Sequence, residues 1–432
     1  TSYTHTLSTP LHEYPYPNSL RNQPSMEFFT YSHPPTAETT NSFYIFIYKK
    51  PHHPRKEVIH IMKIICQKIN LLKSVNISLK AVPSKTTMPI LECILIDATT
   101  NQIKFTTNDM ELGIETIVDG IIEEKGIIAL DAKIFYEIIR RLPDNTVTIK
   151  TDEKLTATIT CEKAKFTIPG KSGEDFAYLP LIEKEESLTI SQFTLKEMIR
   201  QTIFSIASNE TNKLMTGELF EIKNNYLKIV SLDGHRIAIR RMELKKIMLT
   251  AKWWYLAKHL MRSVKILSGE IDDIVNIYFS KNHILFEFDQ TIVVSRLIDG
   301  EYFRIDQMLS SDYETKIKIN KKEFLDCIDR ATLLVREGEK KPIIIEITDN
   351  SMELRIDSAM GSMNENIDID KEGKDILIGF NPRFLIDALK VIDDETISIY
   401  LVNPKAPCFI RDDEENYTYL ILPVNINQNQ AR

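Results

Sequence analysis

The sequence predicts an α+β fold in which one unit of about 125 residues occurs three times after residue 61. Three segments carry the repeat: AKIFYEIIRRLPDNTVTI at 132–149, LAKHLMRSVKILSGE at 256–270 and PRFLIDALKVIDDETISI at 382–399. Leu142, Leu267 and Ile392 occupy the same place in them, at intervals of 125 residues. Each segment has the pattern of a helix, a turn and a β-rich run. A period this long indicates duplicated domains and not a solenoid.

Each unit also contains an earlier helix and further strands. The helical patterns are NLLKSVNISLKAV at 70–82, FTLKEMIRQTIFSIAS at 193–208 and KKEFLDCIDRATLLV at 321–335. Alternating runs such as GELFEIKNNYLKIVSL and KPIIIEITDNSMELRID predict antiparallel strands. We therefore expect domains at 62–183, 184–310 and 311–426, each with two helices packed on antiparallel sheets, and a tail at 427–432.

Residues 1–61 differ from the rest of the chain. They hold six of the nine histidines and eight of the eighteen prolines, but no glycine or aspartate. Lys56–Glu57–Val58 can be encoded by a purine-rich ribosome-binding sequence just before Met62. We expect these residues to be a disordered or artefactual extension, with Met62 as the natural start.

The composition restricts the class of protein. The chain is 43% hydrophobic, with a net charge of −7, and has no apolar run long enough for a membrane span. No CxxC pair or histidine at metal-ligand spacing accompanies the five cysteines, which are Cys66, Cys93, Cys161, Cys327 and Cys408. They read as reduced thiols of a cytoplasmic protein that holds no metal or other cofactor.

Basic residues recur on the second helix of each unit. Lys133 and Arg140, seven residues apart, lie opposite an apolar stripe that includes Phe135. Steps of 125 residues add Lys258, Lys265, Arg383 and Lys390, and Arg141 lies next to Arg140. The earlier helix of the second unit adds Lys196 and Arg200. Any surface helix carries lysines, but agreement in three units of an acidic chain favours a polyanion-binding surface. Such contacts neutralise phosphates without reading bases.

Several motifs resemble those of one family. LPDNTVTI, LKIVSLDGHRIAI, LIDGEYF, IGFNPRFLIDAL and LILPV together resemble the bacterial sliding clamp, the β subunit of the DNA polymerase III holoenzyme, from Met62 to Ile426. The resemblance implies three domains of the DNA clamp fold and a head-to-tail homodimeric ring around double-stranded DNA. It implies a non-enzyme that tethers the polymerase III catalytic subunit, the clamp loader and repair proteins through short peptides. It also adds Lys85, in SKTTMPIL, to the DNA contacts.

SLDGHR at 231–236 can be read in three ways. Asp233 and His235 could serve a nucleic-acid-processing hydrolase, although no third catalytic group accompanies them. Gly234 could simply permit a tight turn. The resemblance instead implies a wall of a partner-peptide pocket, with Arg236 lining it or bonding a backbone carbonyl. That pocket would consist of Met215, Leu232, Gly234, His235, Arg236, Ile237, Pro407, Leu422, Pro423 and Val424.

Two further expectations complete the sequence-based account. The resemblance implies that Phe166 of one subunit meets Leu333 and Leu334 of the other. As an alternative to the clamp, the chain could be a scaffold that does not bind DNA and whose basic faces balance its acidic body.

The segment 245–267, KKIMLTAKWWYLAKHLMRSVKIL, departs from the family pattern. A one-base shift of plausible codons turns its centre into Val-Val-Val-Pro-Gly-Lys, which predicts a local frameshift that is restored near Val264. The alternative is genuine divergence of this segment from the family. We expect Leu256 and Ala257 to replace a proline–glycine turn while the following helix persists. We also expect Trp253 and Trp254 to be exposed and to destabilise the second domain.

Overall fold

The computed structural model describes residues 61–184, 187–208, 212–245, 251–300, 305–309, 312–336, 341–412, 414 and 416–426. The predicted extension, apart from Ile61 at its end, and the tail at 427–432 lie outside the described residues.

The elements fall into three consecutive sets, which we call the first, second and third unit. The first unit contains β1 (Lys63–Gln67), α1 (Lys68–Ser78), β2 (Cys93–Asp97), β3 (Ile103–Asn108), β4 (Leu112–Val118), β5 (Gly120–Glu124), β6 (Ile127–Asp131), α2 (Ala132–Arg141), β7 (Thr146–Thr151), β8 (Thr156–Cys161) and β9 (Ala164–Lys171). The second contains β10 (Ser187–Ser191), α3 (Gln192–Arg200), β11 (Gly217–Lys223), β12 (Tyr226–Leu232), β13 (Arg236–Glu243), β14 (Ala251–Leu256), α4 (Ala257–Val264), β15 (Ile274–Phe279), β16 (His283–Phe288) and β17 (Thr291–Arg296). The third contains β18 (Thr315–Asn320), α5 (Lys321–Thr332), β19 (Ile343–Thr348), β20 (Ser351–Ser358), β21 (Gly361–Asp368), β22 (Asp370–Gly373), β23 (Ile376–Phe380), α6 (Pro382–Leu389), β24 (Thr396–Leu401), β25 (Cys408–Arg411) and β26 (Tyr417–Ile421).

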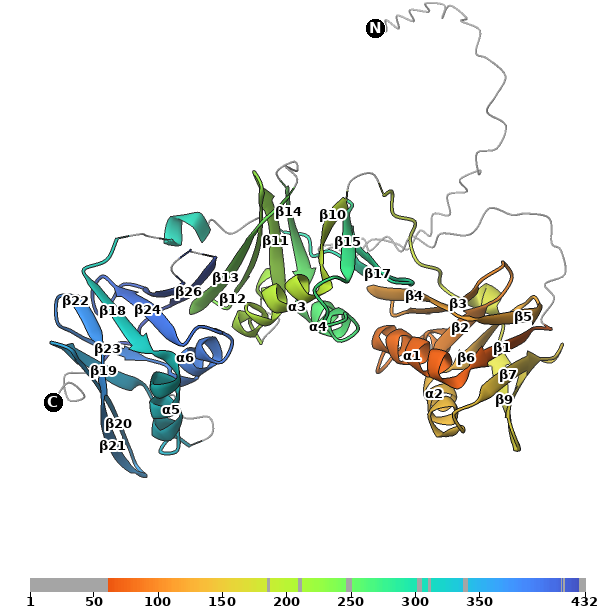
Figure 1. Ribbon diagram of the computed structural model, residues 1–432, viewed down its shortest axis with the longest axis horizontal. Helices are drawn as coiled ribbons and strands as arrows, with labels where there is room; N and C mark the ends of the chain where they lie inside the picture. Colours follow the sequence, from red (N-terminus) through yellow and green to blue (C-terminus); the bar gives the residue numbers. More distant parts are fainter. Residues whose placement is uncertain are drawn as a thin grey trace, which may run out of the picture. The chain divides into compact units, whose positions relative to one another are not determined.

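The repeat found in the sequence is a repeat of structure. Helices α2, α4 and α6 begin at Ala132, Ala257 and Pro382, which are 125 residues apart. The helices lie together in pairs, α1 with α2, α3 with α4, and α5 with α6 (Figure 1). Each unit has its own apolar core, and Phe135, on the predicted stripe of α2, is fully buried in the first of them. The predicted α+β architecture, with antiparallel sheets and two helices in each unit, is confirmed.

Antiparallel sheets join the units directly. Strand β17 of the second unit pairs with β4 of the first, and β26 of the third unit pairs with β13 of the second. These pairings produce one sheet of 13 strands and one of 9, while β21, β20, β19 and β23 form a separate sheet of 4. The first and second units, and likewise the second and third, are therefore joined by the same kind of backbone ladder.

Helix α4 forms within the segment that departs from the family pattern, as expected, although its start is built differently. Asp131 and Asn381 cap α2 and α6 by accepting hydrogen bonds from the backbone N–H groups of Ile134 and Arg383. At the same place α4 has Leu256, which has no side-chain acceptor. Helix α4 instead packs buried Leu260 into the apolar core of the second unit.

The expectation of two exposed tryptophans is wrong. Trp254 is 4% exposed, and Trp253 is half-buried, with its ring stacked on Phe279 at 3.7 Å between ring centroids. The reason is that β14 pairs with β11 in a sheet that is covered on both faces. Trp253 points into the core of the second unit, and Trp254 points into a separate apolar cluster on the opposite face.

Candidate functional site

The SLDGHR segment forms the tight hairpin between β12 and β13. Gly234 has a φ of 88°, a backbone conformation that favours glycine. The Asp233 carboxylate accepts hydrogen bonds from the backbone N–H groups of His235, at 3.0 Å, and Arg236, at 3.2 Å. Its other oxygen accepts from Nε of Arg236 at 3.0 Å. Asp233 therefore stabilises the turn and orients Arg236.

Arg236 links the second unit to the third. Its side chain is 9% exposed and donates to Oδ2 of Asp387, on α6, at 2.7 Å. It also donates to the backbone carbonyl of Phe204 at 2.8 Å, as one of our expectations for it stated. The guanidinium lies 4.3 Å from the centroid of the Phe384 ring, a cation–π contact. Arg236 is thus held on several sides at the junction.

Asp233 and His235, the two candidate catalytic residues, make structural contacts in the hairpin. Both oxygens of Asp233 are occupied by the turn and by Arg236. The His235 ring is stacked on Phe384, with 6.2 Å between the centroids. Within the described ranges, no three His, Cys, Asp or Glu side chains come together as metal ligands would. Asp233 is thus committed to the turn and to Arg236, and no metal-ligand cluster accompanies His235 in the described part of the chain.

An apolar cluster lies on the face of the 9-stranded sheet next to this hairpin, and we call it the outer apolar cluster. It comprises buried Leu219, Val230, Leu232, Ile237, Ile239, Trp254, Ile305, Phe409 and Leu420, with partly buried Leu214, Met215, Ile298, Leu309, Tyr400 and Leu422. Four predicted pocket residues, Met215, Leu232, Ile237 and Leu422, therefore come together. The backbone N–H of Leu422 donates to the carbonyl of His235 at 2.8 Å, which ties the C-terminal segment to the hairpin.

The other predicted pocket residues surround this cluster less tightly. Gly234, His235 and Arg236 form the adjoining hairpin. Pro407 and Pro423 are half-buried, and Val424 is 38% exposed. None of these six residues belongs to the outer apolar cluster. Their part in partner binding stays a prediction.

The sequence reasoning missed one wall of the cluster. Ile305 and Leu309, on and next to the short helix η6 (Ile305–Met308), pack on the sheet from the segment between the second and third units. The ammonium of Lys228 is 3.4 Å from Asp306 and so ties η6 to β12. The signal was available, because LIDGEYF was recognised and IDQML follows it after a single residue.

A buried carboxylate stabilises the same face. Glu221 is 1% exposed, and its oxygens contact the ammonium groups of Lys228 and, at 2.7 Å, Lys252. Burial alone would raise the pKa of the Glu221 carboxyl, but the two ammonium groups outweigh it and hold the pKa below its ordinary value. Glu221 is therefore ionised and links β11 to β12 and β14.

The predicted DNA-contact residues fall into two groups. Arg140 and Arg141 share Glu137 at 2.8 Å, Lys258 pairs with Glu111 at 2.9 Å, and Arg200 pairs with Glu197 and with Asp393 of the third unit. No ion pair is formed within the described ranges by the other six, which are Lys85, Lys133, Lys196, Lys265, Arg383 and Lys390. Of these six, all but half-buried Lys196 are exposed.

The two junctions between units use the same helix position with opposite charges. On α4, Arg262 is 3.0 Å from Asp109 in the turn before β4. One repeat of 125 residues later, Asp387 on α6 is 2.7 Å from Arg236, the first residue of β13. Near the first contact, the neighbouring His259 ring and the Lys258 ammonium lower the pKa of Glu111 to about 2. Helices α4 and α6 therefore each contact the preceding unit next to the hairpin that leads into β4 or β13.

The predicted dimer-contact residues lie at the two ends of the series of units. Phe166, on β9 of the first unit, is 40% exposed. Leu333, just after α5 of the third unit, is 75% exposed. Leu334 lies close to Gly361, where β21 begins.

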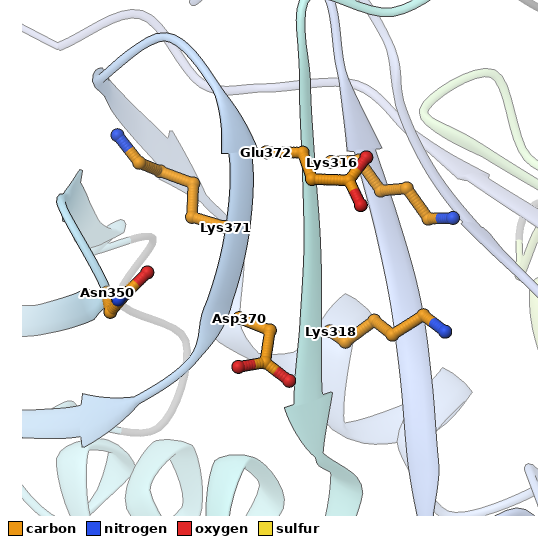
Figure 2. A pocket seen from close by; sticks show the side chains of 6 residues that line it. All are labelled: Lys316, Lys318, Asn350, Asp370, Lys371 and Glu372. Atoms are coloured by element: carbon orange, nitrogen blue, oxygen red, sulfur yellow. The ribbon is translucent and has the colours of Figure 1, made fainter.

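Two hollows on the described surface lie away from the outer apolar cluster. One, of about 260 Å³, is lined by Lys316, Lys318, Asn350, Asp370, Lys371 and Glu372 at the edge of the third unit. Lys371 points away from Lys316 and Lys318, so the three ammonium groups do not converge on a ligand (Figure 2). The other, of about 170 Å³, lies between Arg240 and Asp412. No helix in the described part of the chain is long and apolar enough to cross a membrane.

Comparison with known proteins identifies similar chains. The family models for the DNA polymerase III beta subunit match in all three parts: its N-terminal domain over residues 62–180, its central domain over 189–303 and its C-terminal domain over 306–425. The beta sliding clamp of Bacillus subtilis is 34% identical over 384 residues, which cover 84% of this chain and 99% of that protein. The beta sliding clamp of Staphylococcus aureus is 32% identical, with the same coverage.

Solved structures agree with these matches. The crystal structure of a DNA polymerase III beta subunit from Eubacterium rectale is 67% identical, with a TM-score of 0.83, and covers 84% of this chain and 100% of that one. The crystal structure of the Bacillus subtilis sliding clamp is 33% identical, with a TM-score of 0.82.

Proposed function

The chain belongs to the DNA polymerase III beta subunit family, the beta sliding clamps, and we propose that two copies close head to tail into a ring around duplex DNA. The observation that carries this proposal is the repeated junction between units. We propose domains at 62–183, 184–310 and 311–426 as the repeating parts.

Each internal junction joins two different strands, and one strand of each type has no counterpart within the part of the chain that the structure describes. At each junction, the strand after the turn (β4, then β13) pairs with the last strand of the next unit (β17, then β26). The corresponding strands left over are β21 in the third unit and β9 in the first. Within the described residues β21 pairs with β20, and β9 pairs with β8 and, at its last two residues, with β6. Joining β21 of one copy to β9 of the other closes both ends.

The exposed apolar residues support the same contact. Phe166 lies on β9, and Leu333 and Leu334 lie where α5 ends near the start of β21. A side chain such as Leu333, which is 75% exposed in the single chain, would be buried by a partner at this edge. We therefore assign Phe166, Leu333 and Leu334 to the dimer interface.

The basic helix residues would then contact DNA phosphates. Lys85, Lys133, Lys265, Arg383 and Lys390 are exposed and form no ion pair within the described residues. Because encirclement holds the duplex by geometry, these contacts need only be weak and independent of sequence. Half-buried Lys196 would contribute to the same surface, and Arg140, Arg141, Arg200 and Lys258 would do so after exchanging or sharing their acidic partners.

The outer apolar cluster would receive the partner proteins. Met215 and Leu422 are partly exposed there, beside the hairpin that contains His235. Apolar contacts supply affinity and a few polar groups supply orientation in sites of this kind. We propose that short peptides of the polymerase III catalytic subunit, the clamp loader and repair proteins bind here. The protein would act in the cytoplasm, without enzymatic activity of its own.

The test is retention on DNA of defined topology. The full chain is loaded onto nicked circular DNA with a clamp loader, and bound protein is measured before and after one double-strand cut. We expect retention on the circle and release after the cut. A scaffold that does not bind DNA would be absent from both. A hydrolase would show turnover that His235→Ala abolishes. Retention unaffected by the cut would contradict encirclement.

A further inference from the structure

The two adjacent tryptophans, Trp253 and Trp254, are on opposite faces of strand β14. Successive side chains of a strand alternate between its faces. Trp253 therefore lies in the core of the second unit against Phe279, whereas Trp254 lies in the outer apolar cluster. Trp254 pairs across the ladder with Leu219, another member of that cluster.

We propose that Trp254 is a partner-contact residue that forms the floor of the peptide site and determines which apolar side chain the site accepts. This inference rests on the proposed function, because it assumes that short peptides bind at the outer apolar cluster. The occupant is the apolar part of such a peptide.

Trp254 is a buried member of the cluster whose partly buried members include Leu214, Met215 and Ile298. Helix η5 (Lys213–Thr216), which carries Leu214 and Met215, packs on β14. The backbone carbonyl of Trp254 accepts a hydrogen bond from the N–H of Ile298 at 2.9 Å. Ile298 begins the segment that leads to η6, and side chains of η5, η6 and this segment belong to the same apolar cluster as Trp254.

Met215 offers the way in. It is partly buried and belongs to the same cluster as Trp254. Methionine has three rotatable bonds and changes rotamer easily, so a peptide side chain can displace it and reach the ring below. A large, rigid aromatic surface gives much contact area at little cost in conformational entropy, which is why tryptophan is enriched among residues that dominate binding.

The site thereby differs in shape from one with a small aliphatic residue at this position. A tryptophan floor is shallow and flat, and it favours a leucine or phenylalanine side chain that lies against the indole face. A valine at position 254 would leave a deeper hollow that such side chains do not fill. Trp254 thus sets the depth of the site.

The chain provides its own reporter and its own control. It has two tryptophans, so Trp253→Phe leaves Trp254 as the sole indole, and Trp254→Phe leaves Trp253. Each full-length variant is titrated with a fluorescein-free decapeptide that carries leucine and phenylalanine in an otherwise polar sequence. Affinity is measured separately, by anisotropy of the same peptide labelled with fluorescein.

In Trp253→Phe we expect unchanged affinity and a change in indole emission that saturates with binding. In Trp254→Phe we expect no emission change and affinity at least about fivefold weaker. Circular dichroism and the unfolding temperature verify that both variants are folded. The emission of Trp253→Phe needs no substitution at 254, so the test survives if Trp254→Phe is unstable.

Two outcomes separate the inference from the function beneath it. If the peptide binds but the emission of Trp254 does not respond, and Trp254→Phe binds as well as Trp253→Phe, the inference is overturned while the peptide site stands. If the peptide does not bind the unmodified chain, or if Leu422→Asp leaves its affinity unchanged, the assignment of the peptide site itself fails.

Discussion

Replacing Arg236 with alanine should loosen the junction between the second and third units. The side chain is 9% exposed and bonds Asp233, Asp387 and the carbonyl of Phe204. Breaking a buried ion pair by removing one partner costs roughly 3–5 kcal/mol. Asp387 is 41% exposed and regains water, so we take the lower end, about 3 kcal/mol.

Hydrogen exchange measures this local loss without assuming that the whole chain unfolds in one step. Strand β26 pairs with β13 through residues such as Ile421 and Tyr419. Each tenfold change corresponds to about 1.4 kcal/mol, so β26 amides should exchange about 100-fold faster in Arg236→Ala. The core strands of the first unit should be unchanged.

Arg240 provides a matched control on the same strand. It faces Asp412 across the same junction at 3.5 Å, with a side chain that is 29% exposed. A weaker, more solvated pair contributes about 1 kcal/mol or less, so Arg240→Ala should raise exchange about fivefold at most. Equal effects of the two substitutions would refute the assignment of Arg236 as the main link.

Three further predictions concern the interface, a buried acid and the DNA contacts. Leu333→Asp should yield a monomer in sedimentation velocity, whereas Ile69→Asp, at a similarly exposed residue of α1, should stay dimeric. If both variants are dimeric, Leu333 is not in the dimer interface. Glu218 is fully buried, and burial raises the pKa of its carboxyl to about 8, so the folded state favours the neutral form. The resulting contribution to the free energy of unfolding is fully present below pH 4.5 and is lost as the pH rises through 8. Glu218→Gln should therefore gain about 3 kcal/mol at pH 7 and lose the pH dependence in urea unfolding, and a wild-type curve that is flat from pH 5 to 8 would contradict this. Lys133→Glu should weaken DNA binding in low salt and lower the dependence of the affinity on salt concentration. Neither change would be observed if Lys133 faces away from the duplex.

The architecture could be predicted because the repeat is local. The apolar stripe of α2 and its counterparts 125 residues later are visible in single segments of sequence. The turn at Gly234 was likewise readable from neighbouring residues. Such features depend on contacts within a few residues and on a period that sequence displays directly.

The burial of Trp254 and the links of Arg236 could not be predicted in the same way. Trp254 is covered partly by η6, about fifty residues away, so its strand looked exposed when read alone. The Arg236–Asp387 pair spans 151 residues and two units. Position in the sequence does not tell which charges meet across a junction, as the reversed pair Asp109–Arg262 illustrates.

Native mass spectrometry of the full chain tests ring closure most directly. Two edges that match head to tail can close into a ring or continue into an open series of oligomers. We predict a single dimeric species at micromolar concentration, with no trimer or larger assembly. A monomer at micromolar concentration, or a series of oligomers of increasing size, would contradict the closed ring.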